Sequence, residues 1–252
     1  MANQFAAGNR LLQCLSHRDL DILRPHWEPV DLRVRLNLER PDKHIERVCF
    51  PNTGIISVVA EVKGDQGIEV GVIGFEGMTG LPLLMGDDRW ANNTYVQSSG
   101  EGVTIAADIF SKILQNRPSI HAVLLKYAKT FVMQIAHTAL SNGRANIAKR
   151  LSRWLLMAQD RLRTDEMALT HDFLAIMLGV RRSGVTEQLQ SFASAGLLQS
   201  ERGCIRILQR DRLLEFTGDF YGAPERDYER LLRPYEAEIV KALTFESPLP
   251  IF

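Results

Sequence analysis

Residues 169–206, LTHDFLAIMLGVRRSGVTEQLQSFASAGLLQSERGCIR, decide the fold, because they predict two helices joined by a tight turn and followed by a hairpin. Thr170 is a favourable N-cap for the first helix, and Gly179 is the residue type that ends one. Three apolar residues at helical spacing then give the second helix an inner face: Val185, Leu189 and Phe192. With Gly196 closing that helix, the stretch predicts a helix-turn-helix and a two-stranded wing.

The outer face of the second predicted helix is polar and free to meet a ligand. A recognition helix enters the major groove N-terminus first, where an arginine can donate two hydrogen bonds to one guanine. We therefore expect Arg182, and Arg181 beside it, to donate to a base. The residues expected to set the neighbouring base preference are Ser183, Thr186 and Glu187, and Thr170 is placed with them as a DNA contact.

A helix, a glycine turn and a helix also occur as plain packing hairpins, so the pattern alone favours DNA at roughly even odds. Gly184 raises these odds, because a glycine inside a helix costs about 1 kcal/mol relative to alanine. Close approach to a partner would explain that residue, whereas packing alone gives no reason for it. The predicted wing is a second, independent match.

With these motifs the chain resembles the Crp/Fnr (cyclic-AMP receptor protein) family of transcription regulators, and HDFLAIMLGVRRSGVT is similar to a rhizobial-type branch. A second motif, IGFEGMTGLPLLMGDDRW at residues 73–90, also carries the resemblance, which covers residues from about 10 to 222. It implies an α+β chain with a cyclic-nucleotide-binding-like β-roll, a long dimerisation helix and a winged helix. The domains expected are 1–117, 118–142 and 143–222, followed by a C-terminal helical tail over 223–252.

The same resemblance implies an effector pocket in the 73–90 motif, where Arg89 matches an arginine that holds the cyclic phosphate. The acidic residue that grips the ribose is missing, with Glu76 as the only nearby candidate, and Trp90 would crowd a phosphate. We therefore expect cyclic AMP and cyclic GMP to bind weakly or not at all. The alternative, a packed loop with a structural arginine, stays open.

Hydropathy patterns support this layout independently. Residues 30–36 alternate, and residues 54–62 and 68–73 are β-branched runs punctuated by glycines, which predicts an antiparallel roll. From Pro118 to about Leu140 apolar residues recur every three or four positions over an unusually wide stripe, which favours packing on two sides, one of them a twin helix. A helix buried in a monomer core is the alternative. Asn142–Arg144 is the expected hinge.

Charge is uneven along the chain, although the formal net charge is zero. Between Ser141 and Arg212, twelve basic and seven acidic residues give +5, and the remainder is therefore −5. Such pooling around the helix-turn-helix is what phosphate neutralisation requires. Lys149 and Arg153 are the expected phosphate contacts.

Other classes of function find little support. Three widely spaced cysteines favour reduced thiols over a disulfide framework, an iron–sulfur cluster or a zinc site, and the histidines lack metal-ligand spacing. Nucleotide-binding and hydrolase motifs are also missing, so we expect no enzyme, no metal and no cofactor. No apolar run approaches the length of a membrane span, which fits a cytoplasmic protein.

The sequence therefore predicts a homodimeric, sequence-specific DNA-binding transcription regulator that acts on a pseudo-palindromic operator. Its expected partners are double-stranded DNA, a second copy of the chain and a small-molecule effector of unknown identity, with RNA polymerase as an open addition. The alternative is a signalling or scaffold protein whose winged helix binds protein instead of DNA. The pooled positive charge and Arg182 argue against that alternative.

Overall fold

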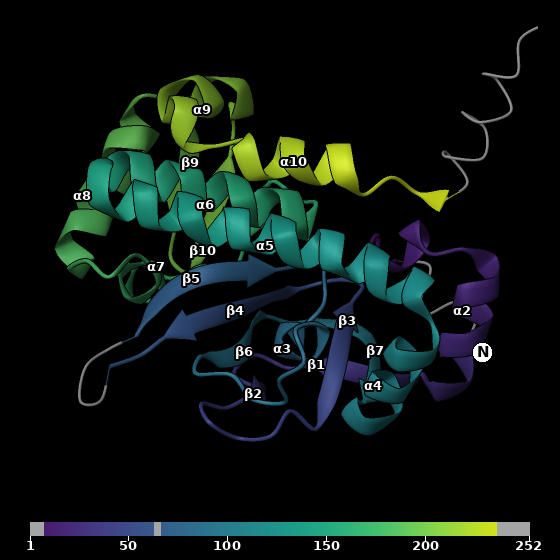
Figure 1. Cartoon of the computed structure of the whole chain (residues 1–252). Coiled ribbons are helices and arrows are strands. Elements are labelled where there is room, and N and C mark those ends of the chain that lie inside the picture. Colours follow the sequence, from purple (N-terminus) through teal and green to yellow (C-terminus); the bar gives the residue numbers. More distant parts are fainter. Residues whose placement is uncertain (1–7, 63–66, 236–252) are drawn as a thin grey trace, which may run out of the picture.

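Two antiparallel sheets form the N-terminal β-roll of the computed structural model, which describes residues 8–62 and 67–235 (Figure 1). One sheet has the order β1–β7–β3, built from Glu28–Leu32, Gly100–Ala106 and Arg47–Pro51. The other has the order β2–β6–β4–β5, built from Asn37–Glu39, Asn93–Ser98, Ile55–Ala60 and Ile68–Ile73. The antiparallel roll predicted from the sequence is confirmed.

One predicted strand is shorter than its pattern. The alternating pattern covers 30–36, but β1 ends at Leu32 and the chain turns before β2 begins. The turn contains Arg35, whose backbone is left-handed with φ of 69°. A strand cannot continue through such a residue. The runs over 54–62 and 68–73 are confirmed as β4 and β5, which pair with each other.

Short helices pack against the roll. The 3-10 turns η1 (Leu12–Cys14) and η2 (Arg24–His26) flank α2 (His17–Leu23), while α3 (Leu81–Leu84) and α4 (Ala107–Asn116) come later in the chain. Their apolar residues join the roll core around Phe50 and Phe110, two large side chains that are fully buried.

The long helix α5 (Pro118–Arg144) lies across the roll and over β5 (Figure 1). Gln134 fixes it there, since its Oε1 accepts from the Val72 amide at 2.6 Å and its Nε2 donates to the Val72 carbonyl at 3.1 Å. The expected hinge at 142–144 is wrong, because α5 continues through Gly143 and ends at Arg144. The break lies at Ala145, whose backbone is extended.

The C-terminal part is built on α6 (Ile147–Leu162), α7 (His171–Leu178) and α8 (Arg182–Ser194). A small sheet follows with the order β8–β10–β9, from Glu166–Met167, Cys204–Ile207 and Leu198–Glu201. The wing is therefore three-stranded rather than two-stranded, because the segment before α7 adds an edge to it. The chain continues with α9 (Arg210–Thr217), η3 (Gly218–Phe220) and α10 (Ala223–Leu231).

Two strands of the roll contribute to the apolar core of the C-terminal part. Ile55 of β4 and Val72 of β5 belong to the same buried cluster as Leu151, Leu155 and the inner residues of α7 and α8. Burial of apolar surface is the main favourable term in such packing, at about 25 cal/mol per Å². The contact therefore holds α6 and α7 against the β4–β5 face of the roll.

The tail helix α10 returns from the C-terminal part to lie along α5 (Figure 1). Asp227 forms an ion pair with Lys129 of α5. The two terminal nitrogens of Arg10 each donate a hydrogen bond to the Glu229 carboxylate at 2.6 Å. The Tyr228 hydroxyl donates to the Glu76 carbonyl at 2.7 Å. The predicted helical tail is thus present over Ala223–Leu231, whereas the rest of that prediction, 236–252, lies outside the described residues.

Two glycines of this frame are expected to respond oppositely to a methyl group. A Cβ at Gly77 would lie 2.1 Å from the Tyr127 hydroxyl, whereas a Cβ at Gly143 in α5 would meet nothing within 4 Å. We expect Gly77→Ala to lower the free energy of unfolding by about 1 to 3 kcal/mol through overpacking. Gly143→Ala should raise it by about 0.5 to 1 kcal/mol through helix propensity. Urea denaturation measures both changes. An unchanged free energy of unfolding in Gly77→Ala would show that the loop around Gly77 adjusts without cost.

Candidate nucleic-acid interface and effector site

The helix-turn-helix begins and ends where the sequence predicts. The Thr170 side chain accepts from the Phe173 amide at 3.2 Å, which caps α7. Gly179 closes α7 with φ of 59°, in the left-handed region that glycine adopts without strain. Gly196 does the same after α8, with φ of 70°. The Thr170 hydroxyl is only the acceptor in this cap and can still donate its own O–H, so the DNA contact predicted for Thr170 stays a prediction.

The leading end of α8 is open to solvent. Arg181, Arg182, Ser183 and Glu187 are all exposed, while Val185 on the opposite face is fully buried. The Arg182 Nε lies 3.2 Å from the Asp172 carboxylate, and both side chains are 65% exposed. An ion pair so exposed contributes less than about 1 kcal/mol. Arg182 is therefore held near the helix start by a contact that a phosphate or base can replace.

His171 connects α7, α8 and β9, a role that was not predicted from the sequence. Its Nδ1 lies 2.9 Å from the Thr186 hydroxyl of α8, and its Nε2 lies 3.3 Å from the Ser200 hydroxyl of β9. The imidazole thus ties the start of α7 to the recognition helix and to the wing. Thr186 is partly buried by this contact, so it is less available to a ligand than Ser183 or Glu187.

Gly184 has an internal explanation that its sequence context did not show. A Cβ at this position would lie 3.2 Å from the Ile147 Cδ1, at the start of α6. Close approach between two helices of the same chain therefore accounts for a small residue here. Gly184 therefore does not require an external partner, contrary to the prediction from the sequence.

The wing carries its own basic residues. Arg202 is exposed in the β9–β10 turn, next to Gly203, which adopts φ of 77°. Arg206 on β10 is paired with Glu166 on β8. Among the described residues, the Arg202 guanidinium has no ion-pair partner, whereas that of Arg206 already has a carboxylate.

Fewer of the counted basic residues face outward than the sequence total suggests. Arg153 is buried with 6% of its surface exposed, and burial lowers its pKa to about 10. It points toward the roll, so the phosphate contact predicted for it is not available in this arrangement. Lys149 is partly buried, with its Nζ 5.5 Å from the centre of the Phe220 ring. Arg161 is buried as well.

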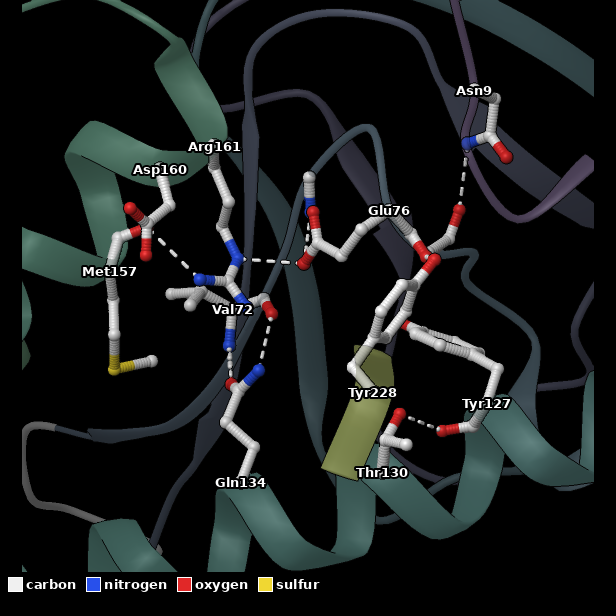
Figure 2. Close-up of polar contacts among 12 residues, drawn as sticks. Asn9, Val72, Glu76, Tyr127, Thr130, Gln134, Met157, Asp160, Arg161 and Tyr228 are labelled. Atoms are coloured by element: carbon white, nitrogen blue, oxygen red, sulfur yellow. Dashed lines mark hydrogen bonds and ion pairs between the residues drawn. The ribbon is translucent and has the colours of Figure 1, made fainter. Parts of the chain in front are cut away.

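The three residues predicted for an effector pocket do not share one site. Glu76 forms an ion pair with Arg161, with 2.8 Å between Oε1 and Nε, in the space between the roll loop and α6 (Figure 2). Arg89 is exposed and lies 2.9 Å from the His44 Nε2. Trp90 packs edge-on against Phe131 of α5, with ring centroids 6.4 Å apart. Of the three, Glu76 alone lines the cavity between the two parts of the chain.

A buried carboxyl lies between the roll and the C-terminal part. The Oε1 of Glu69 accepts from the Trp154 indole at 2.6 Å, and its Oε2 accepts from the Ser57 hydroxyl at 2.6 Å. Burial raises the pKa of Glu69 to about 7, against its usual 4.5. Glu69 is the acidic residue of the otherwise apolar strand Ile68–Ile73. This position was the sequence signal for the site, since a buried carboxyl is costly unless it has hydrogen-bond partners.

Within residues 8–62 and 67–235, no cluster of three or more histidine, cysteine, aspartate or glutamate residues has the geometry to hold a metal ion. None of the helices in this described part of the chain is long and apolar enough to cross a membrane.

Comparison with known families identifies the C-terminal part. Residues 149–216 match the model of the Crp-like helix-turn-helix domain. No curated protein matches the chain. The sequence match covers the region in which α6, α7, α8 and the wing were described above.

Solved structures share the fold of the whole arrangement. FixK2 from Bradyrhizobium japonicum has a TM-score of 0.67 at 16% identity, covering 76% of this chain and 98% of its own. A regulator assigned to the Crp/Fnr family from Eubacterium rectale has a TM-score of 0.64 at 18% identity, covering 82% and 97%. The c-di-GMP-responsive regulator CLP of Xanthomonas campestris has a TM-score of 0.63 at 15% identity, covering 76% and 99%.

The match to the Crp-like helix-turn-helix domain supports a DNA-binding transcription regulator, and the solved structures show a common fold. They also fit the predicted α+β layout, with a cyclic-nucleotide-binding-like roll before the helix-turn-helix. Identities below 20% do not distinguish branches of the family, so the rhizobial-type branch stays a prediction.

Glu69 makes stability depend on pH in a defined direction. Its pKa is about 7 in the folded chain and near the usual 4.5 when unfolded, so the folded state holds the proton more tightly. Stability from this group is therefore full below pH 4.5 and falls as pH rises to about 7, by about 3 kcal/mol. Glu69→Gln should remove that part of the slope.

The measurement is the free energy of unfolding of both proteins between pH 4.5 and pH 8. We expect the free energy of unfolding of Glu69→Gln to rise relative to that of wild type as pH rises. A difference that stays constant across this range would mean that Glu69 keeps one protonation state throughout.

Proposed function

We propose that this chain, with its Crp-like helix-turn-helix domain, regulates transcription by binding a pseudo-palindromic DNA site as a homodimer. The observation that carries the proposal is the leading end of α8, where two arginines and polar residues are exposed above a fully buried apolar face. A helix in that state fits the major groove, whose base edges match arginine and short polar side chains.

Base recognition is assigned to the exposed residues of α8. Arg182 donates to a guanine once it leaves Asp172, and Arg181 at the N-cap position supports it. Ser183 and Glu187 set the preference at neighbouring positions, and Glu187 can accept from a cytosine amine. Thr186 contributes less directly, since its hydroxyl lies against His171.

Phosphate contacts come from basic side chains around this helix. We assign these contacts to Lys149 at the start of α6 and Arg202 in the wing, and each neutralised phosphate releases counterions. Arg153 is left out of this set because it is buried. Binding is therefore expected to weaken steeply with salt.

The dimer is assigned to one face of α5. Its exposed residues recur at alternating spacings of three and four, which is the pattern of a two-helix seam. These residues are Ala122, Leu125, Lys129, Val132, Ala136 and Ala139. Lys129 would place a charge in the seam, but Asp227 of α10 neutralises it within the same chain. Leu125 and Val132, 41% and 53% exposed, are the large apolar contacts.

A two-fold dimer places one recognition helix in each half-site, about one helical turn apart. We further propose that the protein acts in the cytoplasm without enzymatic activity of its own. An effector and RNA polymerase are the additional partners consistent with a regulator of this type.

Loss of the Arg182 side chain should change what the protein recognises. We expect Arg182→Ala to cost roughly 1 to 3 kcal/mol and to relax the preference at one position of each half-site. Lys149→Ala should weaken all sequences alike and flatten the salt dependence. Selection of fragments from a random DNA pool, followed by binding isotherms at several salt concentrations, measures both effects.

The matched control is Arg18→Ala, which removes an exposed arginine from α2 of the roll and should change neither motif nor affinity. An unchanged motif for Arg182→Ala would move Arg182 to the phosphate contacts. A wild-type pool without enrichment, together with no affinity for duplex at low salt, would instead favour the protein-binding alternative.

A charge in the seam should separate the protomers. We expect Val132→Asp to convert the dimer to a monomer at micromolar concentration, because two buried carboxylates would face each other. Val34→Asp is the control, since Val34 is 56% exposed but lies in the roll away from α5. Sedimentation velocity distinguishes the two, and a wild-type protein that is already monomeric, even on DNA, would contradict the assignment.

A further inference from the structure

A cavity of about 390 Å³ lies where the roll, α5, α6 and α10 meet. Its size falls within the range of small-molecule sites. The side chains that matter for its chemistry are Phe75, Glu76, Phe131, Arg161, Glu225 and Tyr228. Figure 2 shows Glu76, Arg161 and Tyr228 at this junction, with Tyr127 and Thr130 on the α5 side. Arg89 does not line the cavity, which is therefore a different place from the one predicted for a cyclic phosphate.

One carboxylate of the wall has an unsatisfied oxygen. Glu76 Oε1 forms an ion pair with Arg161, whereas Glu76 Oε2 is buried and accepts no hydrogen bond from the described residues. A buried acceptor without a donor is costly, so such an atom indicates a missing partner. Glu225 accepts from the Gly222 amide at 3.1 Å, and in the described part of the chain its carboxylate forms no ion pair.

The basic groups of the wall are already paired. Arg161 is matched by Glu76, and Arg10 by Glu229. Asp160, a third carboxylate, is engaged by Arg210 and by the Tyr221 hydroxyl. Among the described residues, an anion entering the cavity would therefore find no guanidinium without a carboxylate partner, although the Arg161 Nε makes no hydrogen bond. A donor would find the Glu76 and Glu225 oxygens.

Aromatic rings complete the wall and already accept cations. The Arg10 guanidinium lies 5.1 Å from the centre of the Tyr228 ring, and that of Arg163 lies 3.3 Å from the Phe75 ring. A cation over an aromatic face is attracted by the ring quadrupole, more strongly when water is excluded. Phe131 adds apolar surface at the α5 side.

We propose that this cavity binds a small organic cation with a flat apolar body, such as an arylalkylamine. Its ammonium group donates to Glu76 and Glu225, and its ring packs against Phe131 and Tyr228. Ligand binding depends only on the residues of the cavity and not on the proposed function. Its regulatory consequence rests on the proposed DNA-binding function.

The regulatory consequence follows because the residues that line the cavity come from four different parts of the chain. Phe75 and Glu76 belong to the roll, Phe131 to α5, Arg161 to the C-terminal part and Tyr228 to the tail helix. A ligand that contacts all four binds best when they are assembled as they are here. By linkage, it stabilises this arrangement and shifts the population of recognition helices available to DNA.

Three probes of nearly equal size test the charge preference by titration calorimetry on the full chain. Tyramine carries an ammonium, 2-(4-hydroxyphenyl)ethanol is neutral, and 3-(4-hydroxyphenyl)propionate is an anion. We expect one tyramine per chain, bound at least about tenfold more tightly than the alcohol, as a charge-assisted hydrogen bond provides. The anion should bind least. Equal affinity for all three, tighter binding of the anion, or no binding of tyramine would overturn the proposal.

Glu225→Gln locates the site, because it removes the charge and keeps an acceptor for the Gly222 amide. We expect tyramine affinity to fall about tenfold while affinity for the alcohol stays unchanged. Glu215→Gln is the control, an exposed carboxylate of α9 that does not line the cavity. Unfolding curves check that both variants are folded, and the three-probe comparison on wild type needs no variant. Unchanged tyramine affinity in Glu225→Gln would reject this cavity.

DNA binding with and without tyramine separates the two proposals. A change in DNA affinity in wild type that Glu225→Gln abolishes would support the regulatory consequence, and unchanged DNA affinity would reject it. Tyramine binding to a chain that binds no DNA would reject the proposed function and leave the cation site in place.

Discussion

The packing of α6 on β4 and β5 is the contact on which the rest of the arrangement depends. Ile55 and Val72 enter the core of the C-terminal part, and Trp154 hydrogen-bonds Glu69 within it. The turn after α7 touches the same sheet, where Gly179 faces Ile68. Because α8 follows that turn directly, the position of the recognition helix relative to the roll is set by this shared core.

Local signals were sufficient to predict the helix-turn-helix. Thr170, Gly179 and Gly196 act through backbone geometry and hydrogen bonds within a few residues, so their residue types alone indicate the caps. The apolar spacing of Val185, Leu189 and Phe192 indicates the buried face for the same reason. The end of α5 was not predictable in this way, since helical hydrogen bonding carried the chain through Asn142–Gly143.

Contacts between distant segments were not predictable from the residue types. Arg153 and Lys149 look alike as basic residues of one helix, yet Arg153 is on the side that faces the roll. Arg89 matches a motif by position, but in this chain it is paired with His44 at the surface. The ion pair of Glu76 with Arg161 joins residues 85 positions apart, and no local pattern encodes such a partner. Tertiary packing decides which of several equivalent charges becomes part of a site.

Gln134 has a consequence beyond holding α5 in place. β5 is the last strand of its sheet, so one side of its backbone has no neighbouring strand. An uncovered edge of this kind can recruit a strand from another molecule and begin aggregation. By bonding both the amide and the carbonyl of Val72, the Gln134 side chain occupies the place that an added strand would take. The helix that serves as the candidate dimer contact thereby also protects the sheet from unwanted association through its edge.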